Sequence, residues 1–400
     1  MSLASTIGGM GIEKAVAIAS LSATAKLLSS IGLGAAAAKK IGVLDASAVS
    51  ALSRLTYWVF QPCFLLYSVG KTLYQASTGG GGLPGNFLVL MPLAAVLQIG
   101  LGALAGSVIT GTAGLQEDEA RDVRMCTTFA NSGPLPLIFA DALFAGSTLQ
   151  AEVAACVSFY LLVWSPLFWS LGRVVLGTYA DDADAAGKDV SAVSKMVQQV
   201  KKILSPPVIG SILGVIVGGV PVLQRAFFGG GIATPLTGAL QTLGTAYLPA
   251  AILVLAGSLV GAKPAATVTA TATPAVVATG TNGAAAVVRT APSLKAIVAI
   301  FMSRFLLAPL LSLGLLQSFV SAGLLGPAGT RARAVVSFVL LMEGCMPPAQ
   351  NSVIMLQLEG LKERASTMAK LLTLMYSLAV IPVTFLLSAC LATSGIMAFK

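Results

Sequence analysis

The chain contains 400 residues, of which 56% are hydrophobic and only 10% are charged, and its mean hydropathy is +0.89. A soluble globular chain is about 45–50% apolar and roughly 25% charged, so this composition excludes an ordinary soluble protein. The absence of histidine excludes imidazole general bases and His-based metal sites. The net charge of +9 comes from Lys and Arg at the ends of apolar runs, which indicates membrane topology and excludes a nucleic-acid surface.

The apolar runs repeatedly reach the roughly 20 residues that a helix needs to cross a hydrocarbon core about 30 Å thick. We therefore predict a multi-pass, all-α integral membrane protein with about ten transmembrane helices. The predicted spans, in chain order, cover residues 12–37, 48–72, 87–112, 122–145, 151–178, 206–223, 234–262, 293–322, 332–358 and 365–395.

Lys and Arg are distributed unequally between the two sides of these spans. The loops after odd-numbered spans, with their flanks, hold most of them, including Lys39, Arg121, Lys201 and Arg364. Because cytoplasmic loops are enriched in Lys and Arg, these loops are predicted to be cytosolic. Both termini are then predicted to be lumenal or extracellular.

A short polar segment at 181–203, predicted to be a cytosolic central loop, divides the chain into two five-span units, 1–180 and 204–400. Prolines recur at corresponding positions of the two units. The pairs are Pro62 with Pro249, Pro92 with Pro309, Pro134 with Pro347, and Pro166 with Pro382. Because each unit has an odd number of spans, the units are predicted to be inverted repeats in the membrane.

The fourth and ninth spans carry paired prolines near their middle. The fourth contains Asn131-Ser132-Gly133-Pro134-Leu135-Pro136, and the ninth contains Met346-Pro347-Pro348-Ala349-Gln350-Asn351. Each proline removes a backbone donor and clashes with the carbonyl four residues earlier, so both helices are predicted to break there. Freed backbone groups at bilayer depth are tolerated only beside protein or a water-lined cavity. Interrupted helices at matching positions of two halves indicate a transporter's substrate site.

Asparagine is rare in this chain and coincides with the breaks. Of the four asparagines, Asn131 and Asn351 lie at the two breaks. Their amides can donate to a carboxylate, and the half-helix N-termini add partial positive charge without a buried Lys or Arg. We therefore expect a small organic anion to bind there, contacted by Asn131, Asn351 and Gln350. The structural alternative is that the prolines are only kinks and the asparagines only cap freed backbone groups.

Glu343 lies four residues before Pro347, inside an apolar span, where an ionisable group is a functional candidate. It is the candidate ion or proton site of the alternative function, a proton- or sodium-coupled exchanger. A protonated Glu343 that only hydrogen-bonds a neighbouring helix is the competing interpretation. No metal cluster or catalytic constellation is visible in the sequence, so we predict no cofactor, no bound metal and no enzymatic activity.

Segments spread over most of the chain carry a family resemblance. They read VFQPCFLLYSVGKTL at 59–73, FANSGPLPLI at 129–138, SPPVIGSILGVIVGGVP at 205–221, PAAILVLAGSL at 249–259, SRFLLAPLL at 303–311 and MPPAQNSVIMLQL at 346–358. At these residues the chain resembles the auxin efflux carrier family. The short central loop favours the PIN-LIKES type within that family.

The resemblance implies two inverted five-helix repeats, with spans 1, 2, 6 and 7 as a scaffold and spans 3–5 and 8–10 as an elevator-like transport domain. The fourth and ninth spans would cross at their breaks. The residues that match the crossover motifs are Asn131, Pro134, Pro136, Pro347, Pro348 and Asn351. The resemblance also implies auxin, typically indole-3-acetic acid, as substrate and the endoplasmic reticulum membrane as location, with the plasma membrane second.

Residues and resemblance together predict an alternating-access carrier whose partners are an auxin-like small organic anion and the lipid bilayer. Gln61 and Tyr57 on the second span are expected to contact the substrate from the scaffold side. The rival prediction is the ion-coupled exchanger that uses Glu343. The sequence leaves a homodimer open.

Overall fold

The computed structural model describes residues 3–78, 87–177, 205–261 and 292–400. Within these ranges every regular element is a helix, which confirms the all-α prediction. The predicted cytosolic loop at 181–203 lies outside the described residues, and the division of the chain into two inverted repeats stays a prediction.

The elements follow the predicted apolar runs in order. Those of the first half are α1 (Leu3–Ile41), α2 (Ala46–Leu55), the π-helical turn η1 (Thr56–Phe60), α3 (Gln61–Ser77), α4 (Phe87–Ala113), α5 (Glu117–Thr128), α6 (Pro134–Phe144) and α7 (Thr148–Leu176). Those of the second half are α10 (Pro206–Gly219), α11 (Pro221–Phe227), α12 (Thr234–Thr245), α13 (Tyr247–Val260), α14 (Leu294–Met302), the π-helical turn η2 (Ser303–Leu307), α15 (Ala308–Ser321), α16 (Arg331–Gly344), α17 (Asn351–Leu358), α18 (Lys362–Ser394) and the 3₁₀ turn η3 (Ile396–Phe399).

Local capping signals set the helix ends outside the membrane-spanning segments. Asp45 begins α2 by accepting a hydrogen bond from the backbone N–H of Ala48 at 2.7 Å. This bond lowers the pKa of the exposed Asp45 carboxyl below its ordinary value. At the C-terminus of α7, Gly177 adopts a φ of +72°, a left-handed conformation that ends the helix.

Five of the described helices are long and apolar enough to cross a membrane. They are Val89–Ala113, Thr148–Leu176, Thr234–Val260, Leu294–Ser321 and Lys362–Ser394. Helices α10 and α11 meet the length and hydropathy of a span only when taken together, and they are bent by 101° where Val220 is extended before Pro221. The predicted span 206–223 is therefore corrected: its straight apolar helix ends at Gly219. The count of ten crossings stays a prediction.

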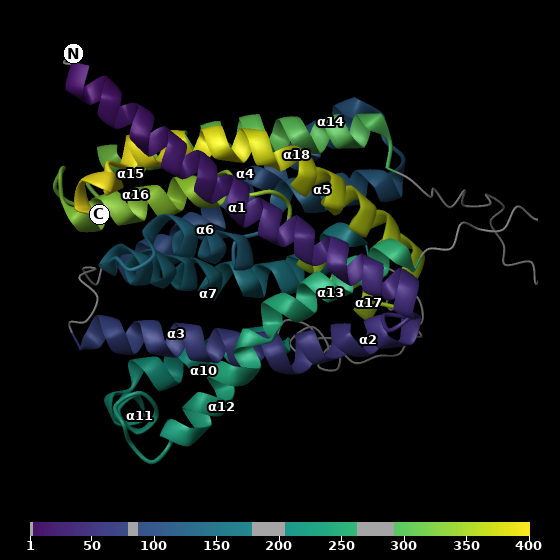
Figure 1. The fold of residues 1–400 in the computed structure, drawn as a ribbon, viewed down its shortest axis with the longest axis horizontal. Helices are drawn as coiled ribbons and strands as arrows, with labels where there is room; N and C mark the ends of the chain where they lie inside the picture. The colour runs from purple at the N-terminus through teal and green to yellow at the C-terminus, as the bar shows by residue number, and fades with distance from the viewer. Residues whose placement is uncertain (1–2, 79–86, 178–204, 262–291) are drawn as a thin grey trace, which may run out of the picture.

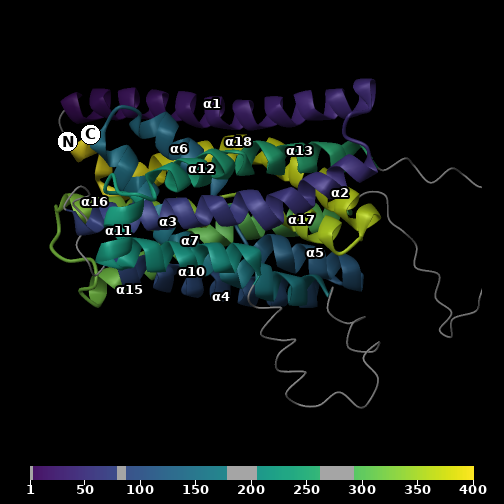
Figure 2. The ribbon, with the colours of Figure 1, turned by 90° about the horizontal axis from the view of Figure 1, so that it is seen from below.

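The helices lie side by side along the long axis of the molecule (Figures 1 and 2). Both termini lie at one end, and α2, α5, α14 and α17 lie toward the other (Figure 1). The long helix α1 covers one side of the bundle, where it packs against α6, α13 and α18 (Figure 2). The long helices thus run roughly parallel to one another between the two ends of the bundle.

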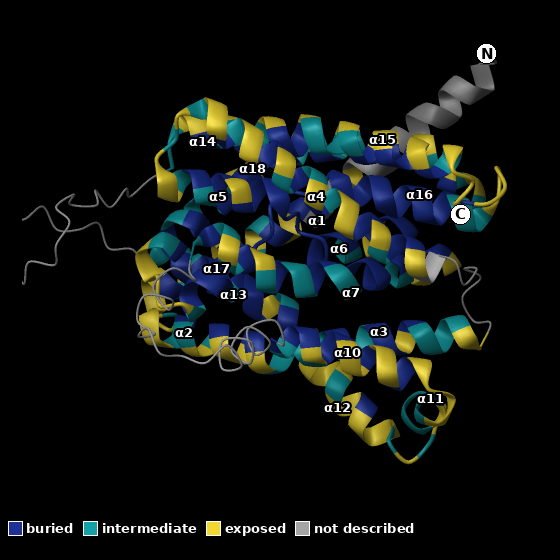
Figure 3. Cartoon of the chain, turned by 180° about the vertical axis from the view of Figure 1, so that it is seen from behind, coloured by how far each residue is buried: buried dark blue, intermediate teal, exposed yellow. Residues whose placement is uncertain are grey.

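Helices α16 and α17 are buried along almost their whole length, as the dark blue ribbon of α16 shows in Figure 3. Every residue of α16 from Ala334 to Gly344, and of α17 from Asn351 to Gln357, is buried. By contrast, α4 and α18 expose large apolar side chains such as Val108 and Phe385. Exposed apolar surface of this kind suits lipid contact. The proline-rich interruption between α16 and α17 consequently lies deep within the protein.

Helices α3 and α10 pack with their backbones in direct contact. A methyl group added at Gly210 would lie 2.5 Å from the carbonyl oxygen of Pro62, and one at Gly218 would lie 2.6 Å from that of Gly70. Both distances are far below van der Waals contact, so only glycine fits. Small residues repeated every four positions are the usual means of bringing membrane helices this close.

Candidate functional site

The predicted fourth and ninth spans are each interrupted near their middle, so that each consists of two helices. Residues 129–133 separate α5 from α6, and residues 345–350 separate α16 from α17. The interruptions coincide with the proline-rich motifs, because proline has no backbone donor to continue a helix. The prolines are Pro134 and Pro136, in the first turn of α6, and Pro347 and Pro348, within the second interruption.

The two interruptions cross and pair as a short antiparallel bridge between Ala130 and Pro348. The backbone N–H of Asn131 donates to the carbonyl of Pro347 at 2.8 Å. The N–H of Ala349 donates to the carbonyl of Phe129 at 3.0 Å. Each interruption therefore satisfies backbone groups that the other lost with its helix, away from lipid.

The side chain of Asn131 connects this crossing to α18. Its Nδ2 donates to the hydroxyl of Tyr376 at 2.9 Å, and that hydroxyl donates to the carbonyl of Pro348 at 2.8 Å. Asn131 and Tyr376 are only 3% and 1% exposed. One amide N–H of Asn131 thus has a structural partner, while the second N–H of the same amide remains for another acceptor.

A cavity with an empty volume of about 320 Å³ lies at the crossing. Four of the five residues predicted to contact the substrate line it, namely Gln61, Asn131, Gln350 and Asn351. The other side chains of its lining are mainly apolar or aromatic and include Phe64, Leu65, Leu161, Trp164 and Tyr247. No charged side chain is found among the described residues of this lining. We call this space the crossover cavity.

Several amide atoms in the crossover cavity are buried without a partner. Asn351 donates from Nδ2 to the hydroxyl of Tyr247 at 2.6 Å, but its Oδ1 has no hydrogen-bond partner among the described residues. The same holds, within those ranges, for Oε1 of Gln61 and for both amide atoms of Gln350. Since buried polar atoms are normally hydrogen-bonded, these amides are poised for a ligand or water.

The N-termini of α6 and α17 both meet the crossover cavity, through Pro134 and Asn351. A helix N-terminus brings partial positive charge, which favours an anion. In α6, however, Pro134 and Pro136 have no N–H, so Leu135 supplies the only donor of the first three positions. Hydrogen bonds to an anion must therefore come mainly from side-chain amides.

Tyr57 does not line the crossover cavity, so its contact with the substrate stays a prediction. It lies in the π-helical turn η1, before Gln61, and its hydroxyl accepts a hydrogen bond from Arg173 at 3.2 Å. Its ring packs against Trp169 with the ring centroids 4.8 Å apart. Arg173 in turn forms an ion pair with Glu359 at 3.1 Å. Tyr57 is therefore held at a different interface.

Arg304, on η2, holds the crossing and is absent from the lining of the crossover cavity. Its Nε and Nη2 donate to the carbonyl of Met346 at 3.1 and 2.8 Å, and its Nη1 donates to the carbonyl of Thr127 at 3.2 Å. These two carbonyls belong to the second interruption and to the last turn of α5. Such carbonyls have no donor within their own helix, so the guanidinium supplies the missing hydrogen-bond donors.

A second cavity, with an empty volume of about 450 Å³, lies beside Arg304. Glu343 lines it together with Gln98, Tyr160 and Ser312. Trp164 lines both cavities and forms part of the wall between them. We call this second space the rear cavity.

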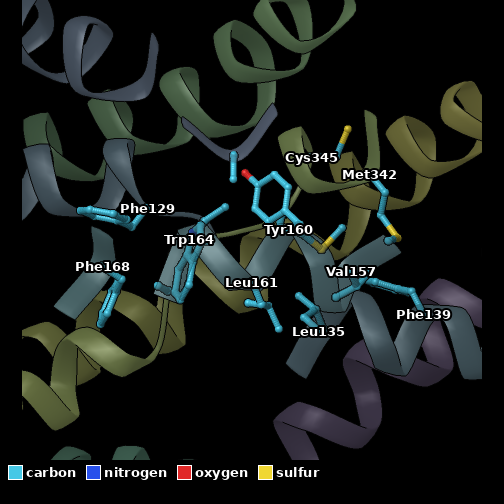
Figure 4. Close-up of a cluster of buried hydrophobic side chains, with 14 of the residues drawn as sticks. Phe129, Leu135, Phe139, Val157, Tyr160, Leu161, Trp164, Phe168, Met342 and Cys345 are labelled. Carbon is cyan, nitrogen blue, oxygen red and sulfur yellow. The ribbon is translucent and has the colours of Figure 1, made fainter. Parts of the chain in front are cut away.

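Aromatic packing on α7 stabilises the wall between the two cavities (Figure 4). Trp164 stacks on Phe168 with centroids 4.8 Å apart, and Phe129, at the first interruption, meets Trp164 edge-on at 6.1 Å. Tyr160 lies one turn from Trp164 on the same helix (Figure 4) and lines the rear cavity. Offset and edge-on ring pairs add specific orientation to apolar burial, so this wall is well defined.

Comparison with known proteins places this architecture in a family. The family model described as membrane transport protein matches residues 19–387, which is most of the chain. The chain belongs to the auxin efflux carrier family. A relative, PIN-LIKES 2 of Arabidopsis thaliana, is 31% identical over 153 residues. That alignment covers 38% of this chain and 27% of the relative's length.

Sequence reasoning missed three residues that shape the candidate site. Arg304, Tyr376 and Tyr247 bond to the crossing or to its asparagines. A signal existed for Arg304, since a cation inside the apolar run SRFLLAPLL is rare in a membrane helix. No comparable signal marks the two tyrosines, because their partners come from distant segments of the chain.

Proposed function

We propose that this membrane transport protein carries a small aromatic carboxylate of the auxin type, such as indole-3-acetate, through the crossover cavity. The observation that carries the proposal is the convergence of four amide side chains and three aromatic rings on one uncharged cavity. The cavity is bounded by α3, α7, α13 and the two interruptions, which leaves little space between their side chains. The substrate is therefore a compact molecule.

The carboxylate binds beside the interruption between α16 and α17. Gln350 has an unpaired amide there, and Asn131 and Asn351 each keep a second N–H after donating to a tyrosine. These donors surround the positive ends of α6 and α17. Charge-assisted hydrogen bonds to a carboxylate are about twice as strong as neutral ones, so several amides suffice without a cation.

The ring of the substrate packs between the aromatic side chains of the cavity. Phe64 and Tyr247 stack with their centroids 5.3 Å apart, and Trp164 also lines the cavity. Aromatic contacts of this kind select a planar apolar ring over an aliphatic chain. An aromatic acid is consequently favoured over a fatty or dicarboxylic acid.

Transport follows from relative movement of two helix groups that meet at this cavity. Gln61, Phe64 and Leu65 of α3 and Tyr247 of α13 belong to the group α1–α3, α10, α12 and α13, the predicted scaffold. The remaining lining residues come from α4–α7 and α14–α18, the predicted elevator-like transport domain. A site shared between two groups opens and closes as one moves against the other, which is alternating access.

The membrane of residence is part of the same proposal. The endoplasmic reticulum is the first assignment and the plasma membrane the second, with both termini lumenal or extracellular. Fluorescent tags at each terminus, combined with protease protection in selectively permeabilised cells, distinguish these arrangements. Cytosolic exposure of either tag would contradict the assigned orientation.

The site is tested by uptake of radiolabelled indole-3-acetate into proteoliposomes that contain wild type or Asn351→Ala. The substitution removes one donor and leaves the buried hydroxyl of Tyr247 without its partner, so uptake is expected to lose roughly tenfold in kcat/KM or more. Gln150→Ala is the matched control, because Gln150 bonds Asp141 at the exposed end of the bundle. Unchanged uptake by Asn351→Ala would refute the site.

Competition by unlabelled compounds tests the substrate class separately. Aromatic carboxylates should compete with indole-3-acetate, whereas indole-3-ethanol, which lacks the charge, and short aliphatic acids should not. Wild-type protein that shows no saturable uptake of any aromatic carboxylate would refute the proposed function itself.

A further inference from the structure

The rear cavity contains the groups that the crossover cavity lacks, namely buried charges. Glu343 is 1% exposed and Arg304 is 4% exposed, and both line the same space of about 450 Å³. No ion pair joins them in the part of the chain that the structure describes. An acidic and a basic side chain thus share one cavity without forming an ion pair.

Several hydrogen-bond acceptors of the rear cavity have no partner among the described residues. Neither carboxyl oxygen of Glu343 has a partner at hydrogen-bond geometry within the described ranges, and the hydroxyl of Ser132, which lies close enough to interact with this carboxyl, also reaches the carbonyl of Ala130 at 3.5 Å. Oε1 of Gln98 is also buried and unpaired there, while its Nε2 donates to Ser312 at 2.8 Å. An ionised carboxylate in such surroundings carries a large desolvation cost.

Arg304, by contrast, donates hydrogen bonds to the crossing of the two interruptions. Three of its N–H groups reach the carbonyls of Met346 and Thr127, at 2.8–3.2 Å. The guanidinium keeps its charge at any physiological pH, so its choice of partner depends on what else in the cavity is negative. Glu343 is the one acidic side chain among the described residues that line the cavity.

We infer that Glu343 is a proton-binding site. Its charge determines whether Arg304 donates to the backbone carbonyls at the crossing or pairs with the carboxylate. With the proton bound, Glu343 is neutral and Arg304 bonds the carbonyls of Met346 and Thr127, as in this structure. When the proton leaves to water in the rear cavity, the carboxylate attracts Arg304 away from those carbonyls. The crossing of the two broken helices then loses its lateral support.

The ligand is a proton rather than a metal cation. Three unpaired oxygens, two of Glu343 and one of Gln98, face the cavity, whereas hard cations such as Ca²⁺ take about 6–8 oxygens. The carbonyls of Met346 and Thr127 would extend that set, but Arg304 already occupies them. A carboxyl needs no ligand shell to bind a proton, so the incomplete oxygen set suits it.

Among the described groups around the rear cavity, Glu343 is the only carboxyl that can bind or release a proton. Arg304 of η2 faces it with a permanent charge, and Tyr160 of α7 faces it with a phenol. The thiols of Cys126 on α5 and Cys345 lie on the Arg304 side, and Cys345 contacts Cys390 of α18 at 3.6 Å. The remaining neighbours of the cavity from α4 and α15, including Gln98 and Ser312, carry no charge.

Infrared difference spectroscopy tests the proton site without any substrate. Stepping the purified protein from about pH 5 to about pH 9 should remove the carbonyl stretch of a buried carboxylic acid. The band should be lost from Glu343→Gln, should shift in Glu343→Asp, and should persist in Glu359→Gln, a control at a partly exposed ion pair. Identical difference spectra for wild type and Glu343→Gln would overturn the assignment.

A second experiment measures the consequence for transport, and this arm rests on the proposed function. Uptake of indole-3-acetate is measured at equal pH on both sides of the membrane, with protein-free liposomes subtracted. Wild type and Glu359→Gln should change by up to about tenfold per pH unit where Glu343 titrates, and Glu343→Gln should be flat. A Glu343→Gln profile that follows wild type, or uptake that requires sodium instead of responding to pH, would overturn the coupling. Absent uptake in wild type at every pH would refute the carrier function instead, and the infrared result would still decide the proton site.

Discussion

Replacing Arg304 provides a direct measure of how strongly the crossing depends on its lateral support. Arg304→Met removes three charge-assisted hydrogen bonds and leaves the carbonyls of Met346 and Thr127 without that partner. An unpaired buried polar group costs about 1–3 kcal/mol, so two cost about 2–6 kcal/mol. Removing a buried cation relieves its desolvation cost, which places the expected loss near the lower end of that range.

Arg304→Lys should fall between wild type and Arg304→Met, because a single ammonium can replace one of the two carbonyl contacts but lacks the planar fork. The assay is thermal unfolding of the purified protein in detergent, followed by size-exclusion chromatography with fluorescence detection. Arg225→Met is the control, since Arg225 is exposed on α11. Equal midpoints for Arg304→Met and Arg225→Met would refute the reasoning, because the carbonyls would then need no guanidinium.

Two further substitutions test the packing on either side of the cavity. Gly210→Ala places a methyl group 2.5 Å from the carbonyl oxygen of Pro62 and should lower the unfolding midpoint by the equivalent of about 1–3 kcal/mol. Gly238→Ala is the control in the same thermal assay. Because nothing lies within 4 Å of the added methyl group, this substitution should be neutral or stabilising. Tyr376→Phe removes the acceptor of Asn131 and should cost about 1–3 kcal/mol in that assay while reducing uptake; a variant with wild-type stability and uptake would show that this hydroxyl does not position Asn131.

The helical ranges and the two interruptions follow from local chemistry, and the sequence was sufficient to predict their positions. Proline excludes a helical hydrogen bond whatever surrounds it, so Pro134 and Pro347 mark interruptions that the structure places within a residue or two. The end of α10 was harder to predict, because the bend at Val220 depends on the extended conformation before Pro221 inside an otherwise apolar run.

The choice of partner by each side chain could not be predicted in the same way. Tyr57 and Gln61 are four residues apart and were expected to act together, yet Arg173 of α7 holds Tyr57 while Gln61 lines the cavity. The partners of Arg304 and Asn131 are likewise separated from them by dozens of residues or more. Spacing along one helix constrains a face, but contacts across the bundle decide what that face meets.

Under the proposed function, the carrier must be stable with its site empty as well as occupied, and this requirement accounts for amides and charges lying in different cavities. In the crossover cavity, Asn131 and Asn351 keep neutral tyrosine partners when no ligand is present, so an empty site leaves no buried charge uncompensated. A guanidinium at the same place would be paired only while the anion is bound, and emptying the site would then cost several kcal/mol. Arg304 avoids that cost because backbone carbonyls, which never leave, are its partners. The scarcity of charge in the apolar segments is thus consistent with a site that must release what it binds.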